Sequence, residues 1–182
     1  PKPGWWDALP DDLPLVYVSP GSSGDARLLP NVLGALAGLP VTVIAATAGR
    51  DAVGVTSPNI HTATFLPGTE AAARADLVIC NGGSPTTQQA LVAGKPVLGI
   101  CSNLDQYLNM QAVEAAGAGI SLRAGKTTPG AVRSAVERLL GDATYLEAAG
   151  RLAEHYRGYD AATRFSDIVA GVLEPDGKRA GG

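Results

Sequence analysis

The sequence has few of the residues that build several common kinds of functional site. Its 182 residues include two cysteines and two histidines, contain no basic run, and carry a formal net charge of -3. Two cysteines cannot form a disulfide framework, and the lack of a basic patch argues against a nucleic-acid partner. No apolar run approaches the ~18 residues of a membrane helix, and no signal peptide opens the chain. We therefore expect a soluble cytoplasmic domain with no transmembrane segment.

Side chains for acid–base or metal chemistry are also scarce. His61 falls at the start of a predicted strand, away from the expected ligand edge. His155 falls in a predicted C-terminal helix, where a histidine is more often a surface residue than a base, so we expect neither to be catalytic. No cluster of Cys, His and Asp has the spacing of a metal site. Cys80 and Cys101 end apolar runs, where a buried thiol behaves as a small hydrophobe. The sequence gives no sign of a catalytic triad or of a metal centre.

What the chain does have is a regular alternation of strand and helix patterns. We expect strands over residues 15–18, 41–46, 60–65, 77–81, 96–101 and 119–123. Helical patterns lie between them, and three more follow the last strand, the first capped by Thr128 with Pro129 at its first position. Alternation of this kind implies right-handed crossovers. The predicted fold class is α/β: a doubly wound, Rossmann-like, six-stranded parallel sheet of order 3-2-1-4-5-6 with a helical C-terminal segment.

The length of the chain suits one domain. We assign residues 15–173 to it, with residues 1–14 as a linker and residues 174–182 as a flexible tail. The linker carries the pair Trp5-Trp6, a large apolar surface. This pair docks on the domain or belongs to an interface with a neighbour, and we favour docking because exposed paired tryptophans are rare.

The most informative stretch runs from Leu77 to Leu91. An apolar strand ends there in Gly82-Gly83, Ser84 can cap the following helix, and Pro85 suits its first position. A glycine turn that leads into a helix N-terminus presents free amides and the positive end of the dipole to one point. This pattern predicts a phosphate above Gly82, Gly83, Thr86 and Thr87, although such a turn can also bind nothing.

A second glycine loop, Ser19-Pro20-Gly21-Ser22-Ser23-Gly24, follows the first strand. In a sheet of order 3-2-1-4-5-6, ligands bind where the strand order reverses, between strands one and four. Both glycine loops follow those two strands, so they should meet in one crevice. Neither loop fits the dinucleotide-binding or P-loop patterns, because no G-x-G-x-x-G follows the first strand and no G-K-[ST] occurs.

The pair Asp105-Gln106 follows the fifth strand beside the same crevice. One carboxylate and one amide can bind vicinal hydroxyl groups through several hydrogen bonds. The spacing of Asn103 and Gln106 also fits a helix capping box, and the residues alone do not decide between these two roles.

Several motifs then occur in the order and at the separations of a known family. Asn81-Gly82-Gly83-Ser84-Pro85-Thr86 is followed by Ala90-Leu91-x-x-Gly94-x-Pro96-Val97, by Asp105-Gln106 with Asn109, and by Gly117-Ala118-Gly119. Over about residues 13–173 the chain resembles the C-terminal, donor-binding half of a family 1, GT-B glycosyltransferase. The resemblance implies inverting, metal-independent transfer from a nucleoside-diphosphate sugar, here a UDP- or dTDP-sugar, with no cofactor.

The residue patterns and the resemblance together predict three groups of ligand contacts. The nucleobase would stack on Phe65, where the family usually has Trp, beside Leu66. Asp105 and Gln106 would bind the donor sugar, which favours the functional role of Gln106 over capping alone. The diphosphate would contact Gly21, Ser22, Ser23, Asn81, Gly82, Gly83, Ser84, Thr86 and Thr87.

Two residues depart from the family pattern. Asn81 replaces the usual His, and a neutral amide can donate a hydrogen bond to the diphosphate but cannot carry charge. Pro85 replaces the usual Gly and removes one amide donor. The resemblance therefore implies that donor binding survives while leaving-group stabilisation is weaker or redistributed.

The resemblance also implies a second domain, because such enzymes react in a cleft between the donor domain and an N-terminal acceptor domain that carries the catalytic base. We expect no catalytic residue in this chain and no transfer by the chain alone. It would be a fragment of a longer enzyme or a stand-alone subunit of a split N-acetylglucosaminyltransferase with a partner subunit. A non-catalytic sugar-nucleotide-binding module is the alternative, whereas the catalytic carboxylates and histidine of the non-hydrolysing epimerases are not identifiable.

Overall fold

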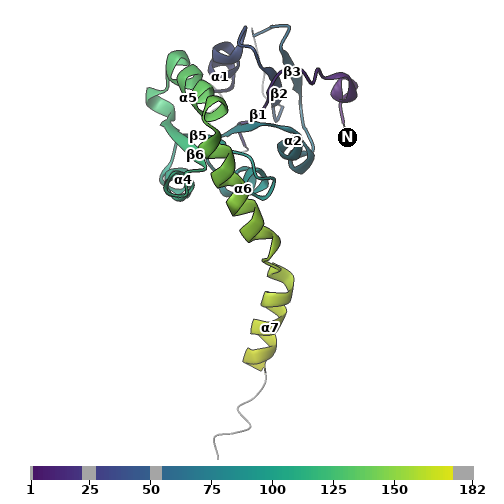
Figure 1. Ribbon diagram of the computed structural model, residues 1–182, viewed down its shortest axis with the longest axis vertical. Helices are drawn as coiled ribbons and strands as arrows, with labels where there is room; N and C mark the ends of the chain where they lie inside the picture. Colours follow the sequence, from purple (N-terminus) through teal and green to yellow (C-terminus); the bar gives the residue numbers. More distant parts are fainter. Residues whose placement is uncertain (1, 22–27, 50–54, 174–182) are drawn as a thin grey trace, which may run out of the picture.

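The structure is a computed structural model that describes residues 2–21, 28–49 and 55–173. Its centre is a sheet of six parallel strands in the order β3-β2-β1-β4-β5-β6, which confirms the predicted fold class (Figure 1). The strands are β1 (Leu15–Ser19), β2 (Thr42–Ala46), β3 (Ile60–Ala63), β4 (Leu77–Cys80), β5 (Val97–Cys101) and β6 (Gly119–Arg123). β3 ends before Phe65, so this strand is shorter than expected and Phe65 lies beyond it.

Helices cover both faces of the sheet. The central strands are apolar on both sides, so both faces have to be shielded from water. In β4, Leu77 and Ile79 face one core and Val78 and Cys80 face the other. The first core packs against α1 (Leu28–Leu36) and α5 (Pro129–Gly141). The second packs against α2 (Gly68–Arg74), α3 (Ser84–Val92), α4 (Leu104–Ala115) and α6 (Ala143–Arg157). Short 3-10 turns lie at η1 (Trp6–Ala8) and η2 (Ala124–Lys126).

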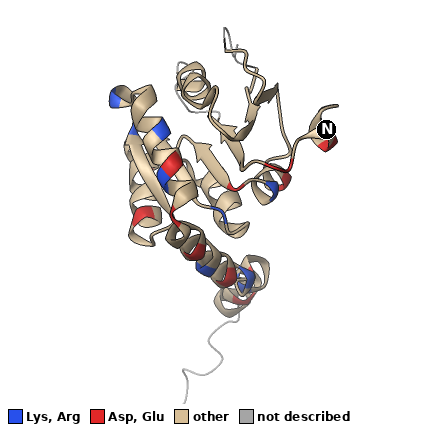
Figure 2. Ribbon diagram, turned by 45° about the horizontal axis from the view of Figure 1, so that its top comes forward, with Lys and Arg blue, Asp and Glu red and all other residues tan. Residues whose placement is uncertain are grey.

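Local sequence signals set the starts of α5 and α6. The Thr128 hydroxyl accepts a hydrogen bond from the Ala131 amide at 3.2 Å, and Pro129 is the first residue of α5, as predicted. Asp142 caps α6 in the same way, through the Thr144 amide at 3.0 Å. Lysine and arginine are interspersed with aspartate and glutamate along the outer helices (Figure 2).

The N-terminal segment packs on the domain. Trp6 is 4% exposed and belongs, with Leu9, to the core that faces α2. The Arg74 guanidinium lies 5.7 Å from the Trp6 ring centroid and donates to the Trp6 carbonyl. Trp5 packs against the same core and contacts the His61 ring at 5.5 Å between centroids. The expectation that the paired tryptophans dock on this domain is confirmed.

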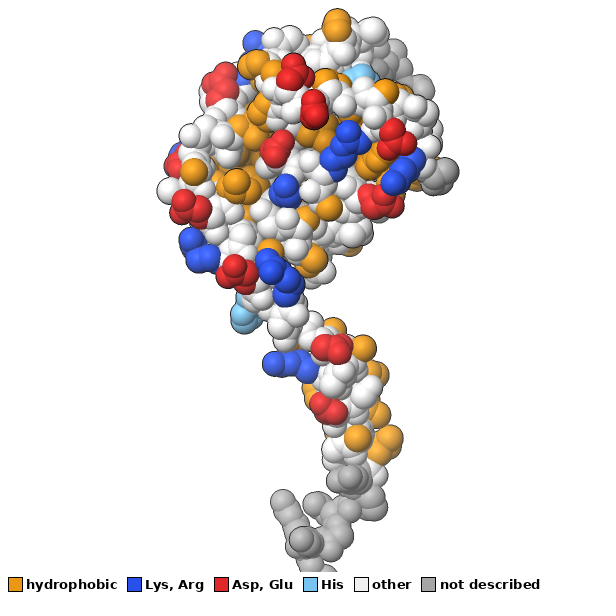
Figure 3. All heavy atoms as spheres, turned by 45° about the vertical axis from the view of Figure 1, so that its right-hand side comes forward, with side chains coloured by type: hydrophobic (Ala, Val, Ile, Leu, Met, Phe, Trp, Pro, Cys, Tyr) orange, Lys and Arg blue, Asp and Glu red, His pale blue; other side chains and the backbone are white. Residues whose placement is uncertain are grey.

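The last described helix, α7 (Ala161–Leu173), stands away from the domain (Figures 1 and 3). None of its 13 residues, all of them described, is buried. Its apolar side chains form one stripe at helical spacing, and all of them are exposed: Phe165, Ile168, Val169, Val172 and Leu173. No helix within the described ranges is long and apolar enough to cross a bilayer.

Candidate functional site

The loops after β1 and β4 meet at the carboxyl edge of the sheet. The two strands are neighbours, with Ser19 in register with Cys80. Gly21 has φ +67°, and a Cβ atom on it would lie 2.8 Å from Asn81 Nδ2. The predicted convergence at the switch point is therefore confirmed for these two residues. Ser22 and Ser23, which were also predicted to contact the diphosphate, lie outside the described residues.

The amides of the Gly82-Gly83 turn are already used within the chain. The Gly82 amide donates to Cys80 Sγ at 3.3 Å, and the Gly83 amide donates to Asn81 Oδ1 at 2.9 Å. A backbone amide that bonds a side chain in this way is unavailable to a ligand unless the turn rearranges. Both amides thus shape the turn, and contact of these two glycines with a phosphate stays a prediction.

The carbonyl groups of the same turn are also bonded. The Gly83 carbonyl accepts from the Thr87 amide at 3.2 Å, inside the first turn of α3. The Gly82 carbonyl accepts from Asn109 Nδ2 on α4 at 2.8 Å. All four backbone polar groups of the turn therefore have partners within the chain.

Gly82 has no room for a side chain. Its φ is +78°, and a Cβ atom would lie 2.8 Å from both Cys101 Sγ and Met110 Cγ. Burial raises the pKa of the Cys101 thiol to about 11 and, in the same direction, that of Cys80. Both cysteines are protonated packing groups beneath the turn, as the sequence predicted.

The donors that α3 offers to an anion come from two residues. Within the described ranges, the amides of Ser84 and Thr86 donate to no other group, and Pro85 between them has no amide. The Thr87 side chain is 1% exposed and its hydroxyl faces Cys80 Sγ at 3.7 Å. The positive end of α3 can thus bind an anion through Ser84 and Thr86, and less readily through the Thr87 hydroxyl.

One local prediction is wrong. Ser84 does not cap α3; it is the first helical residue, and Gly83 is the N-cap without a side-chain hydrogen bond. The Thr87 amide donates to the Gly83 carbonyl, so the first helical hydrogen bond starts at Gly83 and the helix begins one residue earlier than expected. The Ser84 hydroxyl is half-buried and is left beside the open amides.

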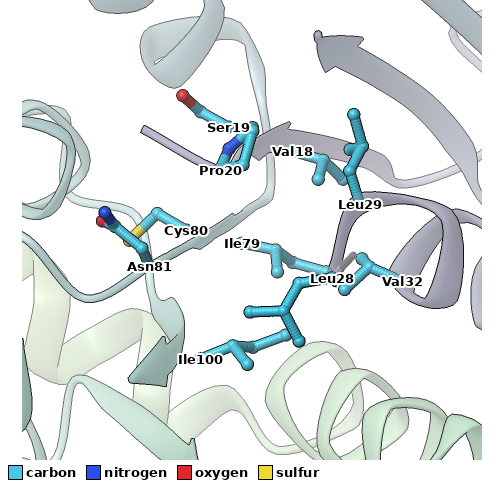
Figure 4. A pocket seen from close by; sticks show the side chains of 10 residues that line it. All are labelled: Val18, Ser19, Pro20, Leu28, Leu29, Val32, Ile79, Cys80, Asn81 and Ile100. Carbon is cyan, nitrogen blue, oxygen red and sulfur yellow. The ribbon is translucent and has the colours of Figure 1, made fainter. Parts of the chain in front are cut away.

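A small hollow of about 20 Å³ lies between β1, β4, β5 and α1 (Figure 4). Asn81 and Ser19 mark one side of it, and aliphatic side chains such as Ile79, Leu29 and Val32 fill the other. A diphosphate would not be stable against that aliphatic side. An anion in this region therefore belongs on the Asn81 side, close to the start of α3.

The start of α4 carries the two residues predicted to bind a sugar. Asn103 Oδ1 accepts from the Gln106 amide at 3.0 Å, so Asn103 is the N-cap. Gln106 Oε1 accepts from the Ser102 amide at 2.8 Å and from the Ser102 hydroxyl at 3.0 Å. The capping role is thus confirmed, in a variant in which Gln106 reaches Ser102.

A sugar-binding role for the same residues stays a prediction. Asp105 is exposed in the first turn of α4 and can reach a ligand without rearrangement. Gln106 is 1% exposed, and its Nε2 atom is buried without a hydrogen-bond partner in the described part of the chain. A donor left unpaired in this way is costly unless a ligand or water accepts from it.

The residues predicted to hold a nucleobase lie on the segment after β3. Phe65 is 68% exposed, and its ring is available for stacking. Leu66 is half-buried and packs against the core. Sequence reasoning did not assign a role to Asn109, although its position one helical turn after Gln106 places both residues on the same side of α4.

Comparison with known proteins gives the family of the chain. The model for "Erythromycin biosynthesis protein CIII-like, C-terminal domain" matches residues 30–168, well over half of the chain. A PGL/p-HBAD biosynthesis glycosyltransferase of Mycobacterium tuberculosis is 54% identical over 154 residues, which are 85% of this chain and 36% of that protein. A PGL/p-HBAD biosynthesis rhamnosyltransferase of Mycobacterium bovis is also 54% identical, over 85% of this chain and 34% of its own length.

Solved structures share the fold. The glycosyltransferase VinC in complex with dTDP superposes with a TM-score of 0.83 at 20% identity, over 95% of this chain and 44% of VinC. The spinosyn rhamnosyltransferase SpnG complexed with thymidine diphosphate gives a TM-score of 0.78 at 24% identity, over 92% of this chain and 48% of SpnG. The chain spans about a third of the length of the curated relatives named above. It belongs to the erythromycin biosynthesis protein CIII-like C-terminal domain family and is a GT-B-type domain of the glycosyltransferases.

Proposed function

We propose that this chain is the donor-binding domain of an inverting glycosyltransferase that uses a nucleoside-diphosphate sugar and no metal cofactor. The observation that carries the proposal is the meeting of the two glycine loops at Gly21 and Asn81, beside the open amides of Ser84 and Thr86. A helix N-terminus of this kind stabilises a diphosphate in the position that a cation would otherwise take.

The donor that we propose is a dTDP-sugar, with a 6-deoxyhexose such as rhamnose as the sugar. One relative with 54% identity is named a rhamnosyltransferase. Two structures with the same fold hold thymidine diphosphate, which supports the base less directly because their identities are 20% and 24%. UDP-sugars are the alternative donors.

The chemistry that the domain supplies concerns the leaving group. In an inverting transfer, the acceptor oxygen bonds to the anomeric carbon as the bond from that carbon to the diphosphate breaks. The electron pair of the broken bond goes to the diphosphate, and the proton of the acceptor goes to a base. The amides of Ser84 and Thr86 stabilise the charge on the diphosphate, while the neutral Asn81 contributes hydrogen bonding without charge.

We place the base and the acceptor site on a second domain, in the same protein or in a partner subunit. The chain spans about a third of the length of its curated relatives, so the rest of such a protein is long enough to hold a second domain. The apolar stripe of α7, which has no partner within the described structure, is a suitable surface for its docking. A membrane surface fits the stripe less well, because the polar side of α7 carries one Arg164 and one Asp167 rather than a basic cluster.

A second candidate function is a non-catalytic sugar-nucleotide-binding module. The departures at Asn81 and Pro85 favour it, since both reduce the means of stabilising a leaving group. Both candidates require donor binding, so activity of the chain with its second domain distinguishes them.

The location of the diphosphate can be tested by NMR titration of the chain with dTDP. The amide signals of Ser84 and Thr86 should shift most among the residues of α3. Thr86→Phe should abolish binding of both dTDP and a dTDP-sugar, whereas Gln88→Phe, further along the same helix, should leave binding intact. If Thr86→Phe bound dTDP as tightly as the wild type, the phosphates would have to bind elsewhere.

A further inference from the structure

We propose that Asn109 is a positioning residue that holds the Gly82-Gly83 turn against α4 and so sets the geometry of the diphosphate site. The inference rests on the proposed function, because it assigns Asn109 a role in donor binding. Asn109 need not contact the donor for this role. It acts through the backbone of the turn.

The bond from Asn109 differs in kind from the other three bonds of the turn. Cys80, Asn81 and Thr87 each bond a glycine no more than four residues away, so these bonds shape the turn locally. Asn109 Nδ2 reaches the Gly82 carbonyl from another element, across 27 residues of sequence, at 2.8 Å. Within the described ranges, this is the hydrogen bond that ties the turn to α4.

The packing around the turn gives that bond a defined geometry. Gly82 lies against Met110, which is 0% exposed, and against the Gln106 carbonyl, 3.2 Å from the position of a Cβ on Gly82. Gln106, Asn109 and Met110 thus contact the same glycine from consecutive turns of α4. A change in the Asn109 bond therefore alters the position of the turn relative to the helix whose first turn holds Asp105.

The position of the Gly82-Gly83 turn sets the direction in which the amides of Ser84 and Thr86 point. Gly83 is the N-cap of α3, and its carbonyl bonds the Thr87 amide. The peptide groups of Ser84 and Thr86 follow directly, so a displaced turn moves both amides away from the diphosphate. Small displacements are costly in such a site, because hydrogen-bond donors must be placed to within a fraction of an ångström.

The side chain at this position has to be a donor. Asn109→Asp keeps the size but places an oxygen against the Gly82 carbonyl oxygen, so the bond is replaced by repulsion. Asn109→Ala removes the bond, and water can enter because Asn109 is half-buried. Gln111→Ala is the matched control, since Gln111 is an exposed amide side chain on the same helix.

The test uses two readouts on the 182-residue chain. Hydrogen exchange over residues 81–87 should become faster in Asn109→Asp, and the dissociation constant for dTDP should rise about tenfold, the loss of one hydrogen bond. The affinity for thymidine, which has no phosphate, should not change, and Gln111→Ala should behave as the wild type. If Asn109→Asp does not fold, Asn109→Ala carries the same test with a smaller expected loss.

The outcomes separate this inference from the proposed function. A folded Asn109 variant with wild-type exchange over residues 81–87, or with wild-type affinity for dTDP, overturns the inference. An equal loss for dTDP and thymidine also overturns it, because a general structural defect would act on both. If the wild type binds no nucleoside diphosphate, the proposed function fails, and the exchange measurement alone decides whether Asn109 holds the turn.

Discussion

A side chain on Gly21 would lie 2.8 Å from Asn81 Nδ2, so the loop after β1 is held against the loop after β4 with no space for a methyl group. This contact joins two segments that are 60 residues apart in the sequence and brings them to the point where the strand order reverses. The predicted ligand crevice is therefore formed by the two loops together and not by either loop alone.

The first prediction concerns this contact. Gly21→Ala should lower the free energy of unfolding by about 1–2 kcal/mol through backbone strain, and should also displace Asn81. Gly38→Ala is the matched control, because Gly38 also has a positive φ, +73°, but a methyl group there would have nothing within 4 Å. Both variants should lose stability in urea titrations, and the Gly21 variant should in addition bind dTDP more weakly. Equal dTDP affinity in the two variants would show that the contact does not matter for the site.

A second prediction separates the roles of Asp105 and Gln106. Asp105→Ala, at an exposed position, should leave stability nearly unchanged but weaken binding of a dTDP-sugar more than binding of dTDP. Gln106→Ala should do the same and also destabilise the chain by about 1–2 kcal/mol, since it removes the bonds to Ser102. Calorimetric titration with both ligands and urea unfolding give the two quantities. Equal losses for dTDP and the dTDP-sugar would argue against contact with the sugar.

The Cys101 thiol provides a prediction about pH. Burial first, and then the charges of Cys80 and Glu114, raise the pKa of this thiol from 9.0 to about 11. The native state therefore holds the proton more tightly than the unfolded chain does, so this stabilisation is complete below pH 9 and is lost as the pH rises towards 11. Between pH 9 and pH 11, the free energy of unfolding should fall less steeply with pH for Cys101→Ala than for the wild type. Identical slopes would contradict the assignment.

The stripe on α7 should matter for association and not for folding. Ile168→Glu and Val172→Glu should change the unfolding free energy by no more than about 0.5 kcal/mol, because both side chains are exposed. They should prevent association with the part of the Mycobacterium tuberculosis relative that this chain does not match, measured by sedimentation. Ala170→Glu, on the opposite side of α7, is the control and should associate normally. Association of the stripe variants at wild-type affinity would place the docking surface elsewhere.

The sequence predicted the sheet well for a physical reason. Runs such as Leu77 to Cys80 are apolar on both faces, as a parallel strand covered by helices on both sides requires. A turn follows this run directly. The alternation with helices led to the predicted strand order, and the two glycine loops follow the two strands at its switch point. The third strand was predicted too long because Thr64 and Phe65 are β-formers that lie beyond the ladder with β2.

The site was less predictable, because its hydrogen bonds depend on tertiary contacts. The glycine turn suggested open amides at Gly82 and Gly83, yet Cys80 and Asn81 occupy both of them. No local pattern distinguishes Asn81 as a partner of Gly83 from Ser84 as a helix cap. The contact from Asn109 was equally hidden, since its partner lies 27 residues away. The sequence could indicate which two loops form the candidate site but not which of its donors are open.

Donor binding itself is best measured by calorimetric titration of the chain with dTDP, UDP and GDP in the absence of metal ions. We predict binding of dTDP in the micromolar range, about -8 kcal/mol, and weaker binding of the other two. Preference for UDP would change the proposed base and leave the site in place. Failure of all three nucleoside diphosphates to bind would contradict the claim that this chain holds the donor.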